Sequence, residues 1–114
     1  MNIVLVAIGG AIGAILRYLT VISVPFPFGT LLVNVVGSFL MGLLFVALAD
    51  QRWMLVTMTG ILGGFTTFSA FSLDVVRLFE GGQVVGAVSY AAGTVLISII
   101  AILAAIALAR TVWA

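Results

Sequence analysis

Residues 60–71 read GILGGFTTFSAF, and this stretch lies inside a long apolar segment. It contains three glycines, three phenylalanines and three hydroxyl side chains. Non-helical backbone and polar groups are costly at membrane depth unless they are buried in protein or line a cavity. A helix that only had to cross a bilayer would not need this composition. The stretch therefore predicts an interrupted span with a site inside the membrane.

The composition of the whole chain is that of a membrane protein. Of its 114 residues, 65% are hydrophobic and 6% are charged, whereas soluble domains have about 25% charged residues. A spanning helix needs roughly 20 mostly apolar residues. We therefore predict four spans, near residues 3–22, 29–49, 53–79 and 83–109. The predicted fold is a single all-α membrane domain over residues 1–114, with four transmembrane helices and a glycine-rich break in the third.

Several function classes are excluded or disfavoured. The chain has no cysteine and no histidine, which excludes disulfides, thiolate chemistry and imidazole-based metal or acid–base sites. The net charge of +1 is too small to suggest nucleic acid. The spans carry no metal-ligand set, no nucleophile–base pair and no paired carboxylates, so we do not expect an enzyme. The first span lacks the basic segment of a secretory signal, and we expect it to be retained.

The arginines give no clear membrane orientation. With four spans, Arg52 and Arg110 lie on one side of the membrane and Arg17 and Arg77 on the other, and the chain has no lysine. Orientation normally follows an excess of Lys and Arg in the cytoplasmic loops. The tie predicts that the chain inserts both ways and that opposite copies pair as an antiparallel dimer. A single orientation with uninformative charges is the other interpretation.

Small residues in the first span predict close helix packing. Gly9 and Gly13, and Gly10 and Ala14, are each four residues apart, and such faces let helix backbones approach closely. This face could pack within the chain's own bundle or at a dimer seam.

Two spans carry rows of polar side chains on one helix face, since each row has a spacing of four residues. Asn34 is the most demanding of them, because its amide has four hydrogen-bonding sites to satisfy. It could clamp two helices together or point a donor into a pathway. The rows are Thr30, Asn34 and Ser38 in the second span, and Tyr90, Thr94 and Ser98 in the fourth.

The third span combines a break with aromatic rings. Gly60, Gly63 and Gly64 predict the break, and carbonyls freed there could coordinate a cation. Phe68 and Phe71 follow at helical spacing. The positive edges of their rings could stabilise a small anion without a fixed charge, and conduction requires such weak binding.

Charged residues near the ends of the spans have simpler interpretations. Arg17 could extend to the membrane interface as an anchor, or it could line an aqueous vestibule that concentrates anions. Asp74 and Arg77 are three residues apart, and we predict that they pair.

Three blocks of the chain resemble the CrcB/Fluc family of fluoride ion channels, in order and over nearly the whole length. They are GGAIGAILRY at 9–18, GTLLVN at 29–34 and GGFTTFSAF at 63–71. The resemblance implies a passive, selective channel that exports fluoride across the bacterial inner membrane. It also implies an antiparallel, dual-topology homodimer in the lipid bilayer, with two pores and one structural sodium ion at the dimer interface.

The resemblance also implies roles for individual residues. Arg17 would be the vestibule arginine, and the backbone carbonyls of Gly63 and Thr66 would bind the sodium ion. The residues implied to line the fluoride pore are Asn34, Phe68, Phe71, Ser69, Tyr90, Thr94, Ser98 and Thr30. This chain departs from the family at two positions, with Ala70 where threonine is common and Asp74 where glutamate is common.

A dual-topology small multidrug exporter is the alternative function. Proton-coupled export needs a carboxylate inside the membrane, and the acidic residue available is Asp74, late in the third span. A purely structural subunit would not require Asn34, the phenylalanine pair and two polar rows.

Overall fold

The computed structural model describes residues 2–48 and 50–113, and these residues form helices and connecting turns without a strand. Four segments are long and apolar enough to cross a membrane. They confirm the four predicted spans to within a few residues, apart from position 49, which lies outside the described residues. The segments are Asn2–Ser23, Phe28–Ala47, Arg52–Glu80 and Val84–Trp113.

The first, second and fourth spans are single helices, and the third is divided. The single helices are α1 (Asn2–Ser23), α2 (Phe28–Ala47) and α6 (Val84–Trp113). The third span begins with α3 (Gln51–Met54), continues as the π-helix η1 (Leu55–Leu62) and the short α4 (Gly63–Phe65), and resumes as α5 (Ser69–Glu80).

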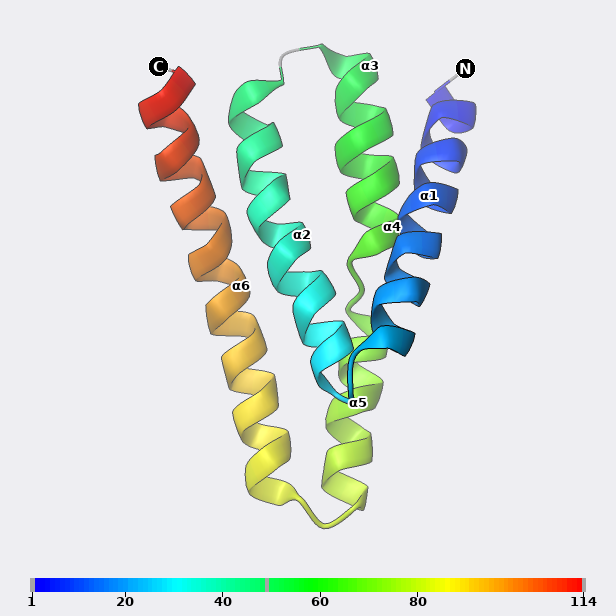
Figure 1. Ribbon diagram of the computed structural model, residues 1–114, viewed down its shortest axis with the longest axis vertical. Coiled ribbons are helices and arrows are strands. Elements are labelled where there is room, and N and C mark those ends of the chain that lie inside the picture. The colour runs from blue at the N-terminus through cyan, green and yellow to red at the C-terminus, as the bar shows by residue number, and fades with distance from the viewer. Residues whose placement is uncertain (1, 49, 114) are drawn as a thin grey trace.

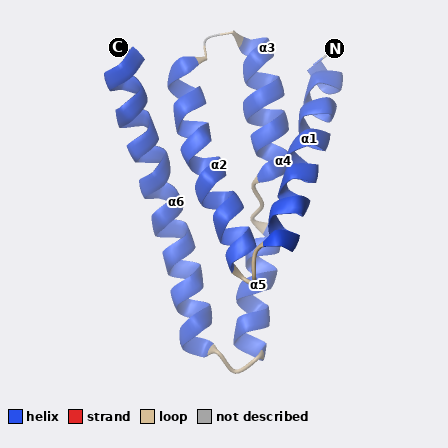
Figure 2. Ribbon diagram, in the orientation of Figure 1, coloured by secondary structure: helices blue, strands red, loops and turns tan. Residues whose placement is uncertain are grey.

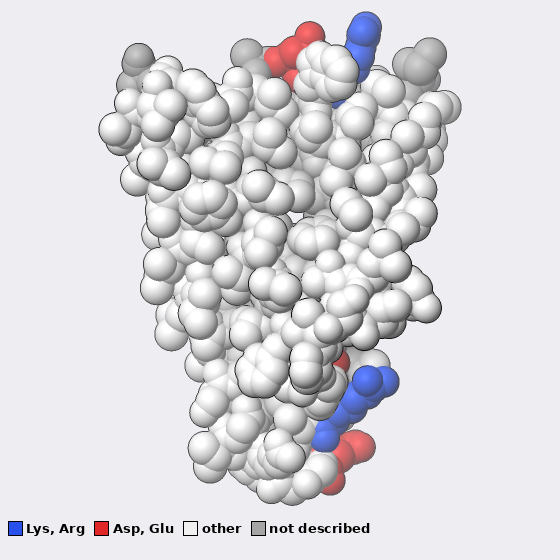
Figure 3. All heavy atoms as spheres, viewed as in Figure 1, with Lys and Arg blue, Asp and Glu red and all other residues white. Residues whose placement is uncertain are grey.

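The helices form a thin slab that measures 47 × 33 × 20 Å. Figure 1 shows α6 lying along α2, and α1 lying along η1 and α4, while α5 lies below the break and packs on α6. Both ends of the chain and the α2–α3 connection lie at one end of the slab, and the turn between α5 and α6 lies at the other. On the face that Figure 3 draws, charged atoms gather near the two ends and leave an uncharged band between them. This distribution suits a protein whose middle lies in hydrocarbon.

The glycines of α1 pack against the third span of the same chain. A methyl group at Gly9 would collide with the carbonyl oxygen of Val56, and one at Gly13 with that of Ile61. In return, a Cβ at Gly60 would lie 2.9 Å from the Cα of Gly9. Of the two interpretations of this small-residue face, packing inside the chain's own bundle is therefore the one the structure supports.

The break in the third span lies after the glycines, which corrects the predicted position. Gly60 is part of η1, and Gly63 and Gly64 are part of α4. The non-helical residues are Thr66, Thr67 and Phe68, and Figure 2 shows them as a loop between α4 and α5. The physical reason is that the glycines are needed for close approach: a Cβ at Gly64 would lie 2.6 Å from the carbonyl oxygen of Gly10.

We expect Gly13→Ala to destabilise the protein by about 1–3 kcal/mol, because the added methyl group meets backbone that cannot move aside. Gly93→Ala in α6 is the matched control, since a Cβ there meets nothing within 4 Å and alanine favours a helix over glycine. Thermal unfolding in detergent measures both. Equal unfolding temperatures for the two variants would contradict the packing described for α1.

Candidate functional site

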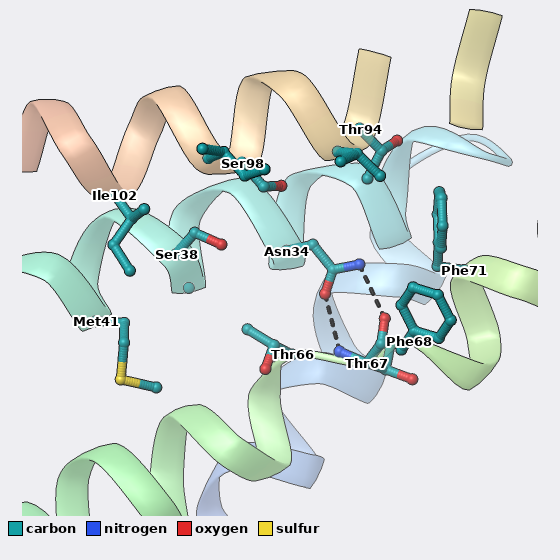
Figure 4. Close-up of a pocket in the computed structure, with 13 residues that line it drawn as sticks. Asn34, Ser38, Met41, Thr66, Thr67, Phe68, Phe71, Thr94, Ser98 and Ile102 are labelled. Atoms are coloured by element: carbon teal, nitrogen blue, oxygen red, sulfur yellow. Dashed lines mark hydrogen bonds between the residues drawn. The ribbon is translucent and has the colours of Figure 1, made fainter. Parts of the chain in front are cut away.

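Asn34 closes the break in the third span with two hydrogen bonds. Its side-chain nitrogen donates to the backbone oxygen of Thr67 at 2.9 Å, and its side-chain oxygen accepts from the backbone nitrogen of Thr67 at 2.8 Å (Figure 4). Backbone groups that leave a helix inside a membrane must find such partners. The amide thus acts as a clamp between α2 and the break. It has four hydrogen-bonding sites, so one donor and one acceptor site remain for another partner.

The hydroxyl groups of the break serve its own backbone. Thr67 Oγ1 accepts from the backbone nitrogen of Ala70 at 3.2 Å and lies 3.3 Å from Ser69 Oγ. Thr66 Oγ1 donates to the backbone oxygen of Leu62 at 2.9 Å. One threonine therefore caps the end of α4 and the other caps the start of α5, as short hydroxyl side chains do at helix ends.

These bonds leave two backbone carbonyls without their usual helical donors. In an α-helix the N–H of a residue bonds the carbonyl four residues earlier. The N–H of Thr67 would therefore bond the carbonyl of Gly63, and the N–H of Ala70 would bond the carbonyl of Thr66. The Thr67 N–H goes to Asn34 instead, and the Ala70 N–H goes to the Thr67 hydroxyl. Gly63 is also exposed. Oxygens of this kind are the ligands that hard cations prefer.

A groove of about 380 Å³ lies beside the clamp. Figure 4 shows side chains from α2, the break and α6 around it. Its lining contains no charged residue, and its polar side chains are an amide and hydroxyls. The lining residues are Asn34, Gly37, Ser38, Met41, Thr66, Thr67, Phe68, Phe71, Thr94, Val95, Ser98, Ile99 and Ile102.

Two hydroxyl groups on the α6 side of the groove have no partner among the described residues. Thr94 Oγ1 and Ser98 Oγ are buried and make no hydrogen bond, and the Thr94 side chain is only 4% exposed. A buried hydroxyl without a partner is costly, and such groups usually bond to something. These two hydroxyls are therefore left with unused hydrogen-bonding capacity.

Aromatic rings line the end of the groove that lies beside α5. The ring centroids of Phe68 and Phe71 are 5.5 Å apart with planes tilted by 54°. Phe71 is buried, whereas Phe68 is 75% exposed in the single chain. In tilted pairs of this kind the positive edge of one ring lies toward the negative face of the other.

With this geometry described, comparison with known proteins identifies the family. A family model described as "CrcB-like protein, Camphor Resistance (CrcB)" matches residues 4–106. The chain belongs to the CrcB family. Its bacterial relatives and its four apolar helices make it a multi-pass protein of the bacterial inner membrane.

Similar CrcB-family proteins match over almost their whole length. The chain is 51% identical over 113 residues to "Fluoride-specific ion channel FluC" of Cereibacter sphaeroides, covering 92% of this chain and 91% of that protein. It is 46% identical over 124 residues to the protein of the same name from Agrobacterium fabrum, with 99% of each covered. It is 45% identical over 121 residues to "Fluoride-specific ion channel FluC 2" of Nitrobacter hamburgensis, with 96% and 98% covered.

The CrcB fold brings together some of the residues predicted for the site and leaves others apart. Ser69 is exposed beside Thr67, Thr30 is buried in α2 one turn before Asn34, and Arg17 is half-buried in α1. None of these three borders the groove. The predicted site residues that do border it are Asn34, Thr66, Phe68, Phe71, Thr94 and Ser98.

Tyr90 and Asp74 form a buried pair that the sequence did not predict. The Tyr90 hydroxyl donates to Asp74 Oδ2 at 3.2 Å, while Arg77 is exposed. The predicted pairing of Asp74 with Arg77 was therefore wrong, because the carboxylate points from α5 toward α6. Tyr90 borders a second cavity of about 350 Å³, and Thr94 borders both this cavity and the groove.

Ser38 is a groove residue that the predicted site omitted. Its spacing of four residues from Asn34 was a usable signal, since it places both on one face of α2.

We expect Asn34→Leu to loosen the break, because it leaves both the N–H and the carbonyl of Thr67 without partners. Each unpaired buried group costs about 1–3 kcal/mol. Hydrogen exchange of a peptide covering residues 66–71 should speed up, and the unfolding temperature should fall. Asn2→Leu is the matched control, since Asn2 is exposed at the start of α1. Unchanged exchange in Asn34→Leu would contradict the clamp.

Proposed function

We propose that this chain is a passive fluoride channel that exports fluoride across the inner membrane. The observation that carries the proposal is the uncharged groove, whose lining includes both the phenylalanine pair and two residues with unpartnered hydroxyls, Thr94 and Ser98. Relatives at 45–51% identity that bear the name fluoride-specific ion channel support it. The relatives are named as channels, which supports a transport protein and not an enzyme.

The chemistry of the groove suits a small anion that must shed its water. The free amide site of Asn34, the hydroxyls of Thr94 and Ser98, and the ring edges of Phe68 and Phe71 would replace the lost hydration. Each of these groups is neutral, so binding stays weak enough for release. Chloride is larger and less strongly hydrated, and we infer that a narrow path of this kind excludes it.

We infer that two copies assemble as an antiparallel dimer of dual topology. Phe68 is 75% exposed in one chain, and a second copy would cover it and close the groove into a pore. The equal division of arginines between the two sides of the membrane supports insertion in both directions. In this arrangement Arg17 lines a vestibule, and Ser69, Tyr90 and Thr30 extend the polar path beyond the groove.

We infer that a sodium ion binds at the dimer interface. The carbonyls of Gly63 and Thr66 fit this role, since the N–H groups that would serve them in a helix are donated elsewhere. Exposure of Gly63 leaves its backbone accessible to a second copy. The ion would hold the two breaks together and take no part in the passage of the anion.

We expect liposomes that contain the purified protein to release fluoride and to retain chloride. Phe68→Ile should reduce fluoride efflux at least tenfold, because it removes the ring edge and keeps an apolar side chain of similar bulk. Phe79→Ile is the matched control, since Phe79 lies on α5, the helix that follows Phe68, is exposed and borders neither the groove nor the cavity beside Tyr90. A fluoride electrode measures the efflux.

Three results would count against the proposal. Fluoride retention by the wild-type protein would overturn the channel. Equal loss of efflux in Phe68→Ile and Phe79→Ile would show that the pore residue is wrongly assigned. Ethidium transport driven by a pH gradient would favour the small multidrug exporter, for which the relatives offer no support.

We also expect sodium to raise the unfolding temperature of the detergent-solubilised dimer in a concentration-dependent way, because a ligand that binds only the folded state stabilises it. Potassium at equal ionic strength is the control. Identical unfolding temperatures in the two salts would contradict the sodium site.

A further inference from the structure

Asp74 is a buried carboxylate inside a spanning segment, and the proposed pathway does not use it. It is 6% exposed and does not border the groove. Ionisable residues are expensive at this depth and mark functional positions. A carboxylate that bordered the groove would repel an anion, and Asp74 instead meets the polar path beyond the groove, through the hydroxyl of Tyr90. Its role must come through the residue that it touches.

That residue is Tyr90, which two residues of α5 hold at once. Its hydroxyl donates to Asp74 at 3.2 Å, and its ring lies 5.4 Å from the ring of Phe71, measured between centroids. Phe71 and Asp74 are three residues apart and therefore lie on one face of α5. The three side chains join α5 to α6 through one buried contact, in the middle of the hydrophobic cluster that also contains Leu78 and Ala87.

This contact sets the geometry of both walls of the groove. On α5, the ring of Phe71 lies between Tyr90 at 5.4 Å and Phe68 at 5.5 Å, so the position of Tyr90 limits how Phe71 can turn. On α6, Tyr90 lies one turn before Thr94 on the same face. Fixing Tyr90 therefore fixes the spacing between the phenylalanine pair and the unpartnered hydroxyls.

We propose that Asp74 is a positioning residue for ion selectivity: through the Tyr90 hydroxyl, it holds Phe71 and the α6 hydroxyls at the spacing that separates fluoride from larger anions. This inference rests on the proposed channel function. The hydrogen-bond acceptor at position 74 is what the arrangement requires, and the negative charge is not. The short aspartate side chain reaches Tyr90 and stays out of the groove.

The test compares four variants in liposomes by the ratio of fluoride to chloride efflux. Asp74→Leu removes the acceptor and Tyr90→Phe removes the donor but keeps the ring. The double variant removes both, and Asp74→Asn keeps an acceptor of the same size without the charge. Glu80→Leu and Tyr18→Phe are the matched controls, since both side chains are exposed. Size-exclusion chromatography selects the variants that remain assembled.

We expect Asp74→Leu and Tyr90→Phe each to lower the ratio about tenfold, the factor that corresponds to one lost hydrogen bond of this strength. The double variant should lose no more than either single variant, because all three break the same contact. Asp74→Asn should stay within about twofold of the wild type, as should both controls. If Asp74→Leu fails to assemble, Tyr90→Phe and Asp74→Asn decide the question.

An unchanged ratio in Tyr90→Phe would overturn the inference. So would a loss in Asp74→Asn equal to that in Tyr90→Phe, since the charge would then be the requirement, and so would additive losses in the double variant. Wild-type protein that releases no fluoride would instead overturn the proposed function, so the two failures are distinguishable.

Discussion

The pair of hydrogen bonds between Asn34 and the backbone of Thr67 is the interaction on which the rest of the structure depends. A spanning helix can stop inside a membrane only if the groups that it frees find partners. Because one amide both donates and accepts, it serves the N–H and the carbonyl of a single residue. The Gly63 carbonyl lacks its helical donor because of that pairing, and the groove lies beside it. An ionised carboxylate at position 34 could accept from the N–H but could not donate to the carbonyl.

The glycines fix the other side of the break. Gly9 and Gly13 allow α1 to lie directly on the backbone of η1 and α4, so the half of the third span before the break is held by close contact between main chains. The half after the break is held differently, by side chains: Phe71, Leu78 and Tyr90 join α5 to α6. The interruption falls where these two modes of packing meet. The half of the third span before the break therefore packs on α1, and the half after it packs on α6. The Asn34 clamp on α2 lies between the two halves.

The spans were predictable because their signal is composition, and uncharged stretches of sufficient length leave few alternatives. The polar rows were predictable for the same kind of reason, since a spacing of four residues defines a helix face. What that face meets depends on how each helix is rotated, which composition does not encode. Asn34 could therefore be assigned to a face but not to Thr67, and Asp74 was paired with Arg77 nearby in sequence when its partner is Tyr90 on another helix. The break was misplaced because glycine permits two outcomes, an interruption or a close contact, and the neighbouring glycines of α1 decide between them.

The distribution of polarity along the proposed pathway has a simple electrostatic logic. An anion in a low-dielectric groove interacts strongly with any fixed charge, so a cation there would trap it and an anionic side chain would exclude it. The groove lining has neither: its polar groups are an amide and hydroxyls, and its aromatic groups offer ring edges. The buried carboxylate of α5, Asp74, does not border the groove and accepts a hydrogen bond from a tyrosine hydroxyl. That bond places the neutral end of the pair, the Tyr90 ring, against Phe71. The carboxyl group thus supports the wall of the pathway from behind, where its acceptor oxygen holds the Tyr90 hydroxyl without bordering the groove.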